Sequence, residues 1–407
     1  MKSNSEVWIV SDTYAPSDIS TAHLLTKLVE ELQCRGWRVR VLCATPAEAQ
    51  VREDSKAIVR VGLGGEYSTM KRRVFTAVTN VLMLGAAAMR LDRPAVVLCL
   101  TNPPVLPLLL TEIAQWRGFR YGLLVHDVYP DVLAAVGWIK SRSALYAMLD
   151  PVFSYAVKRA AQVIVLGRDM LQLVARKRGG VGSAPKVIPN WADHEEIVPA
   201  DRVSNSLLRD LDLGNRFVVQ YSGNLGRTHG VDDLLVAADG LRAITDVCFL
   251  VIGAGARLRE LEERVAKENL TNVVVRQRVP RAELSVSLNA CDLAIIAFQQ
   301  GMAGISVPCR MYNIMAAGKP ILAVTDNDSE LSRVVKEEGI GWVVPPGYPE
   351  QIITAINEAC RLDPKLLREM GRRARRAVEE KYTLSKAVDA YEEVLNQLAH
   401  VEPVTVV

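Results

Sequence analysis

The chain has 407 residues, with 49 Lys and Arg against 46 Asp and Glu, and 49% of it is hydrophobic. At roughly 100–200 residues per domain this length predicts two or three domains, and the large apolar fraction excludes a disordered chain. A formal net charge of only +3 argues against a dedicated nucleic-acid binder, which carries a strongly basic face. The seven cysteines include no CxxC pair, so we expect a reducing, cytoplasmic compartment. We also expect no signal peptide, because the short polar N-terminus leads directly into a strand.

The first half of the chain alternates apolar runs with helical patterns. Val7–Val10 predicts a strand, leucines from 24 to 32 recur at helical spacing, and 39–43 predicts a second strand. Further strands are predicted at 95–100, 120–125 and 162–166. These runs are continuously apolar, as in parallel strands that are buried on both faces.

A second alternating series begins at residue 217, after a polar stretch at 189–215 that lacks clean periodicity. Its predicted strands are 217–221, 247–252, 273–276, 293–297, 320–324 and 341–344. Its predicted helices are 231–242, 257–268, 281–290, 308–317, 329–338, 349–361 and a long stretch at 365–399 with a break near Thr383. The sequence therefore predicts an α/β protein with two Rossmann-like domains, 1–200 and 201–383, whose parallel sheets face each other across a cleft.

The loop from Tyr221 to Gly230 follows a predicted strand and precedes a helix. Gly223 and Gly226 let backbone N–H groups approach an anion, and Arg227 can neutralise a phosphate. Asn224 and His229 add further donors. An ordinary glycine-containing strand–helix turn is the alternative.

Two other loops of the second half could reach the cleft. Gly253 and Gly255 begin a dinucleotide-type pattern, but its third glycine would fall at Leu258, so a tight turn is the alternative. Ser306 can cap a helix whose early position is Pro308, and such a helix N-terminus attracts anions. Arg310 and Asn313 are three residues apart and share a helix face.

In the first half, the strand that ends at Val125 leads into His126, Asp127 and Asp131. Polar side chains at the carboxyl end of a parallel strand lie where a cleft opens. A structural histidine is the alternative. The five histidines show no HxxxH or HxH spacing, so we expect no metal and no cofactor beyond a substrate.

Four segments, taken in this order, resemble the GT4 family of retaining glycosyltransferases with the GT-B fold, closest to the branch that builds bacterial surface polysaccharides. They are Asp12–Pro16, His126–Asp131, Tyr221–Gly230 and Ser306–Pro320. The resemblance covers nearly the whole chain. It implies a nucleotide-sugar donor in the second domain, an acceptor on the first, and a C-terminal helix, 384–407, that crosses back to the first domain.

The resemblance also implies residue roles. His126 matches the histidine that lies near the transferred sugar, and Asp127 and Asp131 fall on the acceptor side. Arg227 and Arg310 would meet the charge of the departing diphosphate. The expected donor-binding residues are Gly223, Asn224, His229, Gly253, Ser306, Val307 and Asn313.

Several positions differ from the usual family pattern. Asn224 and His229 stand where the family usually has Arg and Lys. In the family's Glu-x7-Glu pair, Ile305 replaces the first glutamate and Asn313 replaces the second, which usually holds the nucleotide ribose. These replacements keep two alternatives open, a GT-B epimerase or hydrolase and a non-catalytic nucleotide-sugar-binding protein.

The function we expect is retaining transfer of a sugar from a UDP-sugar to a lipid-linked saccharide. The segment 71–93 bears on where this takes place. Lys71-Arg72-Arg73 precedes an apolar stretch, 74–89, that is too short and too polar to span a bilayer. A basic-flanked helix of this kind can lie on an anionic bilayer, here the inner face of the cell membrane, and a core helix is the alternative.

Overall fold

The computed structural model describes residues 6–46, 57–63, 70–91 and 96–400. The first half of the chain forms a seven-stranded sheet, all parallel, in the order β3-β2-β1-β4-β5-β6-β7. Its strands are β1 (Glu6–Ser11), β2 (Arg38–Ala44), β3 (Ile58–Val61), β4 (Val96–Leu100), β5 (Arg120–Val125), β6 (Gln162–Val165) and β7 (Lys186–Val187). The residues of β4 and β6 are all buried, which explains why β4 is apolar throughout and β6 is apolar after Gln162.

Helices cover both faces of this sheet. They are α1 (Ser20–Cys34), α2 (Met70–Ala88), α3 (Leu106–Arg117), α4 (Asp131–Ala135), α5 (Ala144–Arg159) and α6 (Arg168–Arg178). Helix α1 buries Leu25, Leu28 and Leu32, the leucines that recur at helical spacing. A connecting segment with the short helices η1 (Arg202–Ser204) and α7 (Ser206–Asp210) leads into the second half.

The second half forms a six-stranded parallel sheet in the order β10-β9-β8-β11-β12-β13. Its strands are β8 (Phe217–Asn224), β9 (Val247–Ala254), β10 (Val273–Gln277), β11 (Leu293–Ala297), β12 (Ile321–Val324) and β13 (Gly341–Val344). Its helices are α8 (Val231–Gly240), α9 (Leu258–Lys267), η2 (Arg281–Glu283), α10 (Leu284–Asn289), α11 (Arg310–Ala316), α12 (Glu330–Glu338), α13 (Pro349–Arg361) and α14 (Pro364–Lys381). Val218 and Val219 pack into separate cores on opposite faces of the sheet.

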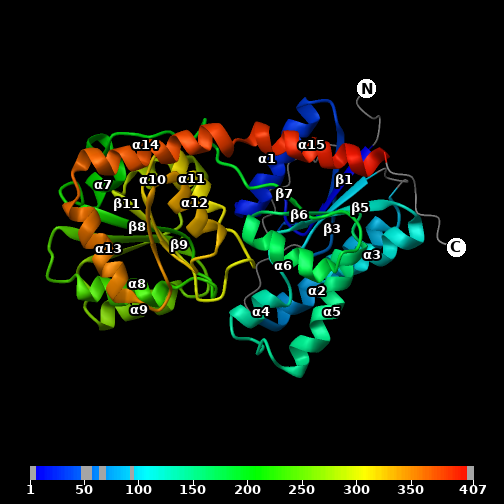
Figure 1. Ribbon diagram of the computed structural model, residues 1–407, viewed down its shortest axis with the longest axis horizontal. Helices are drawn as coiled ribbons and strands as arrows, with labels where there is room; N and C mark the ends of the chain where they lie inside the picture. Colours follow the sequence, from blue (N-terminus) through cyan, green and yellow to red (C-terminus); the bar gives the residue numbers. More distant parts are fainter. Residues whose placement is uncertain (1–5, 47–56, 64–69, 92–95, 401–407) are drawn as a thin grey trace.

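The last helix, α15 (Leu384–His400), belongs to the core of the first half although it follows the second half in sequence. Figure 1 shows α14 and α15 nearly end to end along one side of the molecule, joining the two halves. Val388, Tyr391 and Leu395 are buried against the first sheet, and Arg35, directly after α1, bonds Glu392 at 2.9 Å. The chain therefore returns to its first half at its end.

The predicted fold class is confirmed: both sheets are parallel and covered by helices. In each sheet the strand order reverses direction once, between β1 and β4 and between β8 and β11. Ligands of open α/β sheets bind beyond the carboxyl ends of the strands at such reversals. The residues that follow β8 and β11 are therefore where a ligand of the second half should lie.

Candidate active site

A cavity of about 620 Å³ opens between the two halves, beyond the carboxyl end of β8. The first half contributes the start of α1 and the loop before it, including Asp18 and His23. The connecting segment contributes Trp191 and Asp193. The second half contributes, among others, Gly223, Asn224, Arg278, Arg281, Arg310 and Asn313. The cavity thus brings together residues that are far apart in sequence, several of which the sequence predicts.

Arg310 is one of three arginines that line this cavity, with Arg278 and Arg281. Its Nη1 donates to the Tyr221 hydroxyl at 2.9 Å, and the guanidinium carbon lies 4.7 Å from the centre of the Tyr221 ring. Its Nε and Nη2 atoms are buried and have no hydrogen-bond partner, and among the described residues it forms no ion pair. A desolvated cation without a counter-charge is costly, so this guanidinium is well placed to receive an anion.

Gly223 allows Arg310 to approach the backbone of β8. Its φ is +150°, and a Cβ atom at this position would lie 2.5 Å from Arg310 Nη1. Gly253 pairs with Gly223 across β8 and β9, and a Cβ there would lie 2.3 Å from the Gly223 carbonyl oxygen. Gly253 does not line the cavity. It pairs instead with β8, whose residues Gly223 and Asn224 do line the cavity.

The other polar residues of the same loop are placed differently. Asn224 lines the cavity. Arg227 is exposed and does not line this cavity. His229 stacks on Phe298, with ring centres 5.6 Å apart. Burial, and then the charge of Arg310, lower the pKa of His229 to about 3. His229 is therefore a neutral ring at physiological pH.

Asp12 and His126 follow β1 and β5 of the first half, and neither lines this cavity. Burial lowers the pKa of His126 to about 4, so this imidazole is neutral at physiological pH. Burial raises the pKa of Asp127, and it raises the pKa of Asp12 to about 6. The Oδ1 atom of Asp12 is buried without a hydrogen-bond partner. Asp12 follows β1 as His126 follows β5, so the rule that identified His126 would also have identified Asp12.

The two halves touch where these residues meet the segment before α11. Asp127 and Ser306 form an antiparallel bridge, and the Val128 N–H donates to the Ile305 carbonyl at 3.0 Å. Val307 packs into the core of the first half. The prediction that Ser306 caps a helix is wrong. The bridge holds Ser306 in the segment between the halves, and α11 begins at Arg310 with Cys309 before it.

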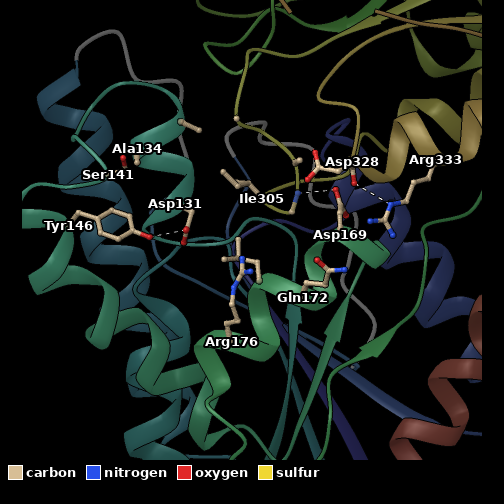
Figure 2. A pocket seen from close by; sticks show the side chains of 15 residues that line it. Asp131, Ala134, Ser141, Tyr146, Asp169, Gln172, Arg176, Ile305, Asp328 and Arg333 are labelled. Atoms are coloured by element: carbon tan, nitrogen blue, oxygen red, sulfur yellow. Dashed lines mark hydrogen bonds between the residues drawn. The ribbon is translucent and has the colours of Figure 1, made fainter. Parts of the chain in front are cut away.

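A second cavity, of about 470 Å³, lies between the halves on the side of α4, α5 and α6. Figure 2 shows Asp131 and Tyr146 on one wall and Asp169, Asp328 and Arg333 on the other. The Tyr146 hydroxyl donates to Asp131 at 2.9 Å, and the buried Lys177 amine lies 2.7 Å from the other oxygen of that carboxylate. Of the two predicted acceptor-side residues, Asp131 lines this cavity, whereas Asp127 lies near the domain contact.

Asn313 faces the first cavity together with a carboxylate that the sequence did not point to. The Asp193 N–H donates to Asn313 Oδ1 at 3.4 Å. The Asp193 carboxylate bonds His23 Nε2 at 2.9 Å and also bonds Arg281. Asp193 lies in the irregular connecting segment, where no periodicity or motif marks it.

Comparison with known proteins identifies the family of this chain. Residues 22–191 match the family described as "Glycosyl transferase 4-like domain", and residues 208–377 match "Glycosyl transferases group 1". The probable glycosyltransferase WbjE of Pseudomonas aeruginosa is 30% identical over 386 residues, 93% of this chain and 94% of that protein. This chain belongs to the GT4 family of retaining glycosyltransferases. A putative colanic acid biosynthesis glycosyl transferase of Escherichia coli, WcaI, is 24% identical over 88% of this chain and 92% of its own length.

Solved structures confirm the GT-B fold of this glycosyltransferase. HepE of Anabaena, in complex with UDP and glucose, superposes with a TM-score of 0.74 at 15% identity, over 97% of this chain and 100% of that one. WaaG, a glycosyltransferase involved in lipopolysaccharide biosynthesis, superposes with a TM-score of 0.69 at 16% identity, over 96% of this chain and 99% of that one. In the described part of the glycosyltransferase, no helix is long and apolar enough to cross a membrane.

Three partly buried histidines of the glycosyltransferase predict how its stability depends on pH. The pKa values of His23 and His126 are lowered to about 4 and that of His229 to about 3, in each case chiefly by burial. The unfolded chain therefore binds more protons as pH falls below about 6.5, and the free energy of unfolding falls with it. At pH 5 we expect a loss of about 2 kcal/mol per histidine relative to pH 7.

Asp12 acts in the opposite direction over part of this range. Its raised pKa returns about 1 kcal/mol as pH falls from 7 to 5. A net loss should remain in urea unfolding measured at pH 7, 6 and 5. His229→Asn should lose less stability over this range than the wild type. Identical pH dependence in the two proteins would refute the assignment of a buried neutral His229.

Proposed function

We propose that this glycosyltransferase moves a sugar from a UDP-sugar to a lipid-linked saccharide acceptor during assembly of a bacterial surface polysaccharide. The observation that carries the proposal is the buried Arg310 guanidinium, which faces a cavity of about 620 Å³ without a counter-charge. A diphosphate would supply that charge. The UDP and glucose bound to HepE, and the colanic acid role named for WcaI, support the choice of donor and pathway class.

The proposed reaction retains the configuration of the anomeric carbon. The diphosphate leaves toward Arg310, Gly223 and Asn224, and the acceptor hydroxyl attacks from the same face of the sugar. Preorganised donors lower the barrier by stabilising the charge that develops on the leaving group. His126, neutral at physiological pH, would contact the sugar as a hydrogen-bond partner rather than as a cation. Arg227 would have to turn inward to join this site, because it is exposed without ligand.

The second cavity is the space that we assign to the acceptor. It is lined by the hydroxyl of Tyr146, the amide of Gln172 and several charged groups, which suits a ligand rich in hydroxyl groups. It borders the loop that contains Gly304 and Ile305, directly before Ser306 of the Asp127–Ser306 bridge. An acceptor there would meet the donor sugar beside this loop.

A transfer assay tests the proposal. The purified enzyme is incubated with radiolabelled UDP-glucose, UDP-galactose, UDP-N-acetylglucosamine or GDP-mannose and with lipid-linked saccharides extracted from bacterial membranes. We expect label in the lipid fraction with a UDP-sugar. The same donors without acceptor provide the control: free sugar or a new epimer there would favour the hydrolase or epimerase alternative. Donor binding without transfer to any acceptor would favour the non-catalytic alternative.

The exposed apolar face of helix α2 supports the proposal that this reaction takes place at a membrane surface. Phe75, Val78 and Leu82, at helical spacing along one face, are 66%, 54% and 61% exposed. The core-helix alternative therefore holds only for the opposite face, which buries Val81 and Leu84. Arg72 is exposed at the start of the helix. The side chains of Lys71 and Arg73, and all of residues 92–93, lie outside the described residues.

We expect the enzyme to co-sediment with vesicles that contain phosphatidylglycerol, because apolar burial and attraction to anionic lipid act together. Phe75→Ser/Leu82→Ser should lower the bound fraction severalfold, as should neutral replacements of Lys71, Arg72 and Arg73. Val203→Ser, at an 86% exposed position of the connecting segment, is the matched control and should bind as the wild type. Equal binding of all four proteins would exclude α2 as the contact.

A further inference from the structure

We propose that Asp169 is a positioning residue for sugar transfer. Its carboxylate, which belongs to the first half of the chain, holds the loop 301–307 of the second half in the conformation that transfer requires. This role rests on the proposed function, because it takes the two cavities as donor and acceptor sites. It assigns a purpose to a contact between the halves that the proposed function leaves unused.

The loop 301–307 leads from one cavity to the other. Four of its residues line the second cavity, namely Gly301, Ala303, Gly304 and Ile305. Arg310, three residues after the loop ends, lines the first cavity. The conformation of the loop therefore influences how a ligand in one cavity lies relative to a ligand in the other.

Both halves hold this loop through hydrogen bonds to its backbone. Within the second half, the Asp326 carboxylate accepts from the Gly301 N–H at 3.1 Å and from the Ala303 N–H at 3.0 Å. From the first half, Asp169 Oδ2 accepts from the Gly304 N–H at 2.9 Å, on the wall of the second cavity that Figure 2 shows. Asp169 thus ties the loop to α6, whereas Asp326 ties it to its own domain.

The Asp169 carboxylate is 7% exposed, and among the described residues it bonds backbone N–H groups alone. Besides the bond from Gly304, Oδ2 accepts from the Glu330 N–H at 3.0 Å, and Oδ1 accepts from the Met170 N–H at 2.7 Å. Hydrogen bonds to an ionised carboxylate are roughly twice as strong as those between neutral groups. Loss of this carboxylate would leave the N–H groups of Gly304 and Glu330 without their acceptor.

The contact between α6 and α12 is reciprocal. Asp169, in the first turn of α6, accepts from Glu330, the first residue of α12, and the Glu330 carboxylate accepts from the Arg168 N–H at 2.9 Å. Each carboxylate thus lies at the N-terminus of a helix of the other half, where the helix dipole favours negative charge. Gly167 permits this approach, because a Cβ atom there would lie 2.8 Å from Val307 Cγ2 and 2.9 Å from Glu330 Cβ.

A second contact between the same two helices provides a matched control. Arg168 Nη1 lies 2.9 Å from the Glu337 carboxylate, and the two side chains are 39% and 52% exposed. This ion pair joins the halves as Asp169 does, but it does not contact the loop. Glu337→Gln should therefore leave loop and activity unchanged, since exposed ion pairs contribute little.

Asp169→Asn in the full-length enzyme tests the role. The new amide nitrogen is a donor, so it must face a backbone N–H group where an oxygen now accepts. We expect hydrogen–deuterium exchange of the segment 301–307 to become about tenfold faster or more. We expect kcat to fall about tenfold or more, because a small misplacement of reacting groups is costly. Calorimetry with UDP should give an affinity within about twofold of the wild type, because the contact of Arg310 with Tyr221 is untouched.

Gly304→Ala disrupts the same contact from the side of the loop. The φ of Gly304 is +74°, and a Cβ atom there would lie 3.1 Å from the Asp169 carbonyl oxygen, so alanine strains the loop and moves it away from α6. We expect the same split between kcat and UDP affinity. In the double variant kcat should fall by less than the product of the two separate effects, because both changes remove one contact. Thermal unfolding checks that each variant is folded, and Gly304→Ala carries the comparison alone if Asp169→Asn does not fold.

The outcomes separate this role from the proposed function. Wild-type loop exchange or wild-type kcat in Asp169→Asn would overturn it. So would a fall in kcat that Glu337→Gln shares, or one that a loss of UDP affinity fully accounts for. Absence of transfer by the wild type with every donor would overturn the proposed function instead, and loop exchange in Asp169→Asn would still decide whether Asp169 holds the loop.

Discussion

Replacing Arg310 with alanine is expected to lower kcat about 100-fold, because it removes a preorganised donor from the departing diphosphate. The fold should survive. Arg310 forms no ion pair among the described residues, so the variant leaves no carboxylate without its partner. Initial rates of sugar transfer measure the loss, and circular dichroism checks the fold.

Variants of two other arginines serve as comparisons in this experiment. Arg259→Ala removes a side chain that is 89% exposed on α9, and it should leave kcat unchanged. Arg227→Ala decides whether the exposed loop arginine turns into the site when donor binds. A loss of similar size would place it there, and wild-type activity would exclude it. Wild-type activity in Arg310→Ala itself would remove the observation on which the proposed function rests.

Replacing Gly223 with alanine is expected to damage both stability and donor binding. At φ of +150° any residue with a Cβ is strained, by about 1–3 kcal/mol. The new methyl group would also lie 2.5 Å from Arg310 Nη1. The end of that side chain can move, so the clash displaces the guanidinium rather than the strand. We expect a loss of about tenfold or more in donor affinity, measured by calorimetry with UDP.

Gly214→Ala is the matched control for this variant. Position 214 has no heavy atom within 4 Å of a built Cβ, and its φ lies outside the strained range. We expect its stability to stay the same or rise by about 0.5 kcal/mol, because alanine restricts the unfolded chain. If Gly223→Ala bound UDP as tightly as Gly214→Ala does, the close approach of Arg310 to β8 would have no role in donor binding.

The fold was largely predictable because long, continuous apolar runs specify buried parallel strands. The strand ends of the second sheet agree with prediction within three residues, since β8 continues to Asn224. The short strands β3 (Ile58–Val61) and β7 (Lys186–Val187) were missed. Both lie at sheet edges, and neither has a run of apolar residues long enough to stand out. Pairing with a neighbouring strand, rather than local sequence, creates them.

The site was predictable where residues lie at the carboxyl end of a strand or at the start of the helix after it. Gly223 and Asn224 end β8, Arg310 and Asn313 lie on α11, and all four line one cavity. Asp193 could not be found in this way, because the folding of an irregular segment against both halves brings it there. The predicted cap role of Ser306 failed for a related reason: its backbone pairs with Asp127, far away in sequence.

Because Asn224 and His229 are neutral, the proposed diphosphate site depends on Arg310. His229 cannot supply a charge, because its pKa lies near 3, and Asn224 carries none. Among the described residues that line the cavity, Arg278 bonds the Asp18 carbonyl and Arg281 bonds the Asp193 carboxylate. Arg310 is the arginine there that has buried guanidinium nitrogens without a partner and no contact with a carboxylate.

The most direct test compares the binding of UDP and uridine to the wild type and to Arg310→Ala by calorimetry. If Arg310 holds the diphosphate, the wild type should bind UDP at least about tenfold more tightly than uridine, as expected for charge-assisted hydrogen bonds. The variant should lose most of that difference while binding uridine as before. Unchanged UDP affinity in Arg310→Ala would contradict the account.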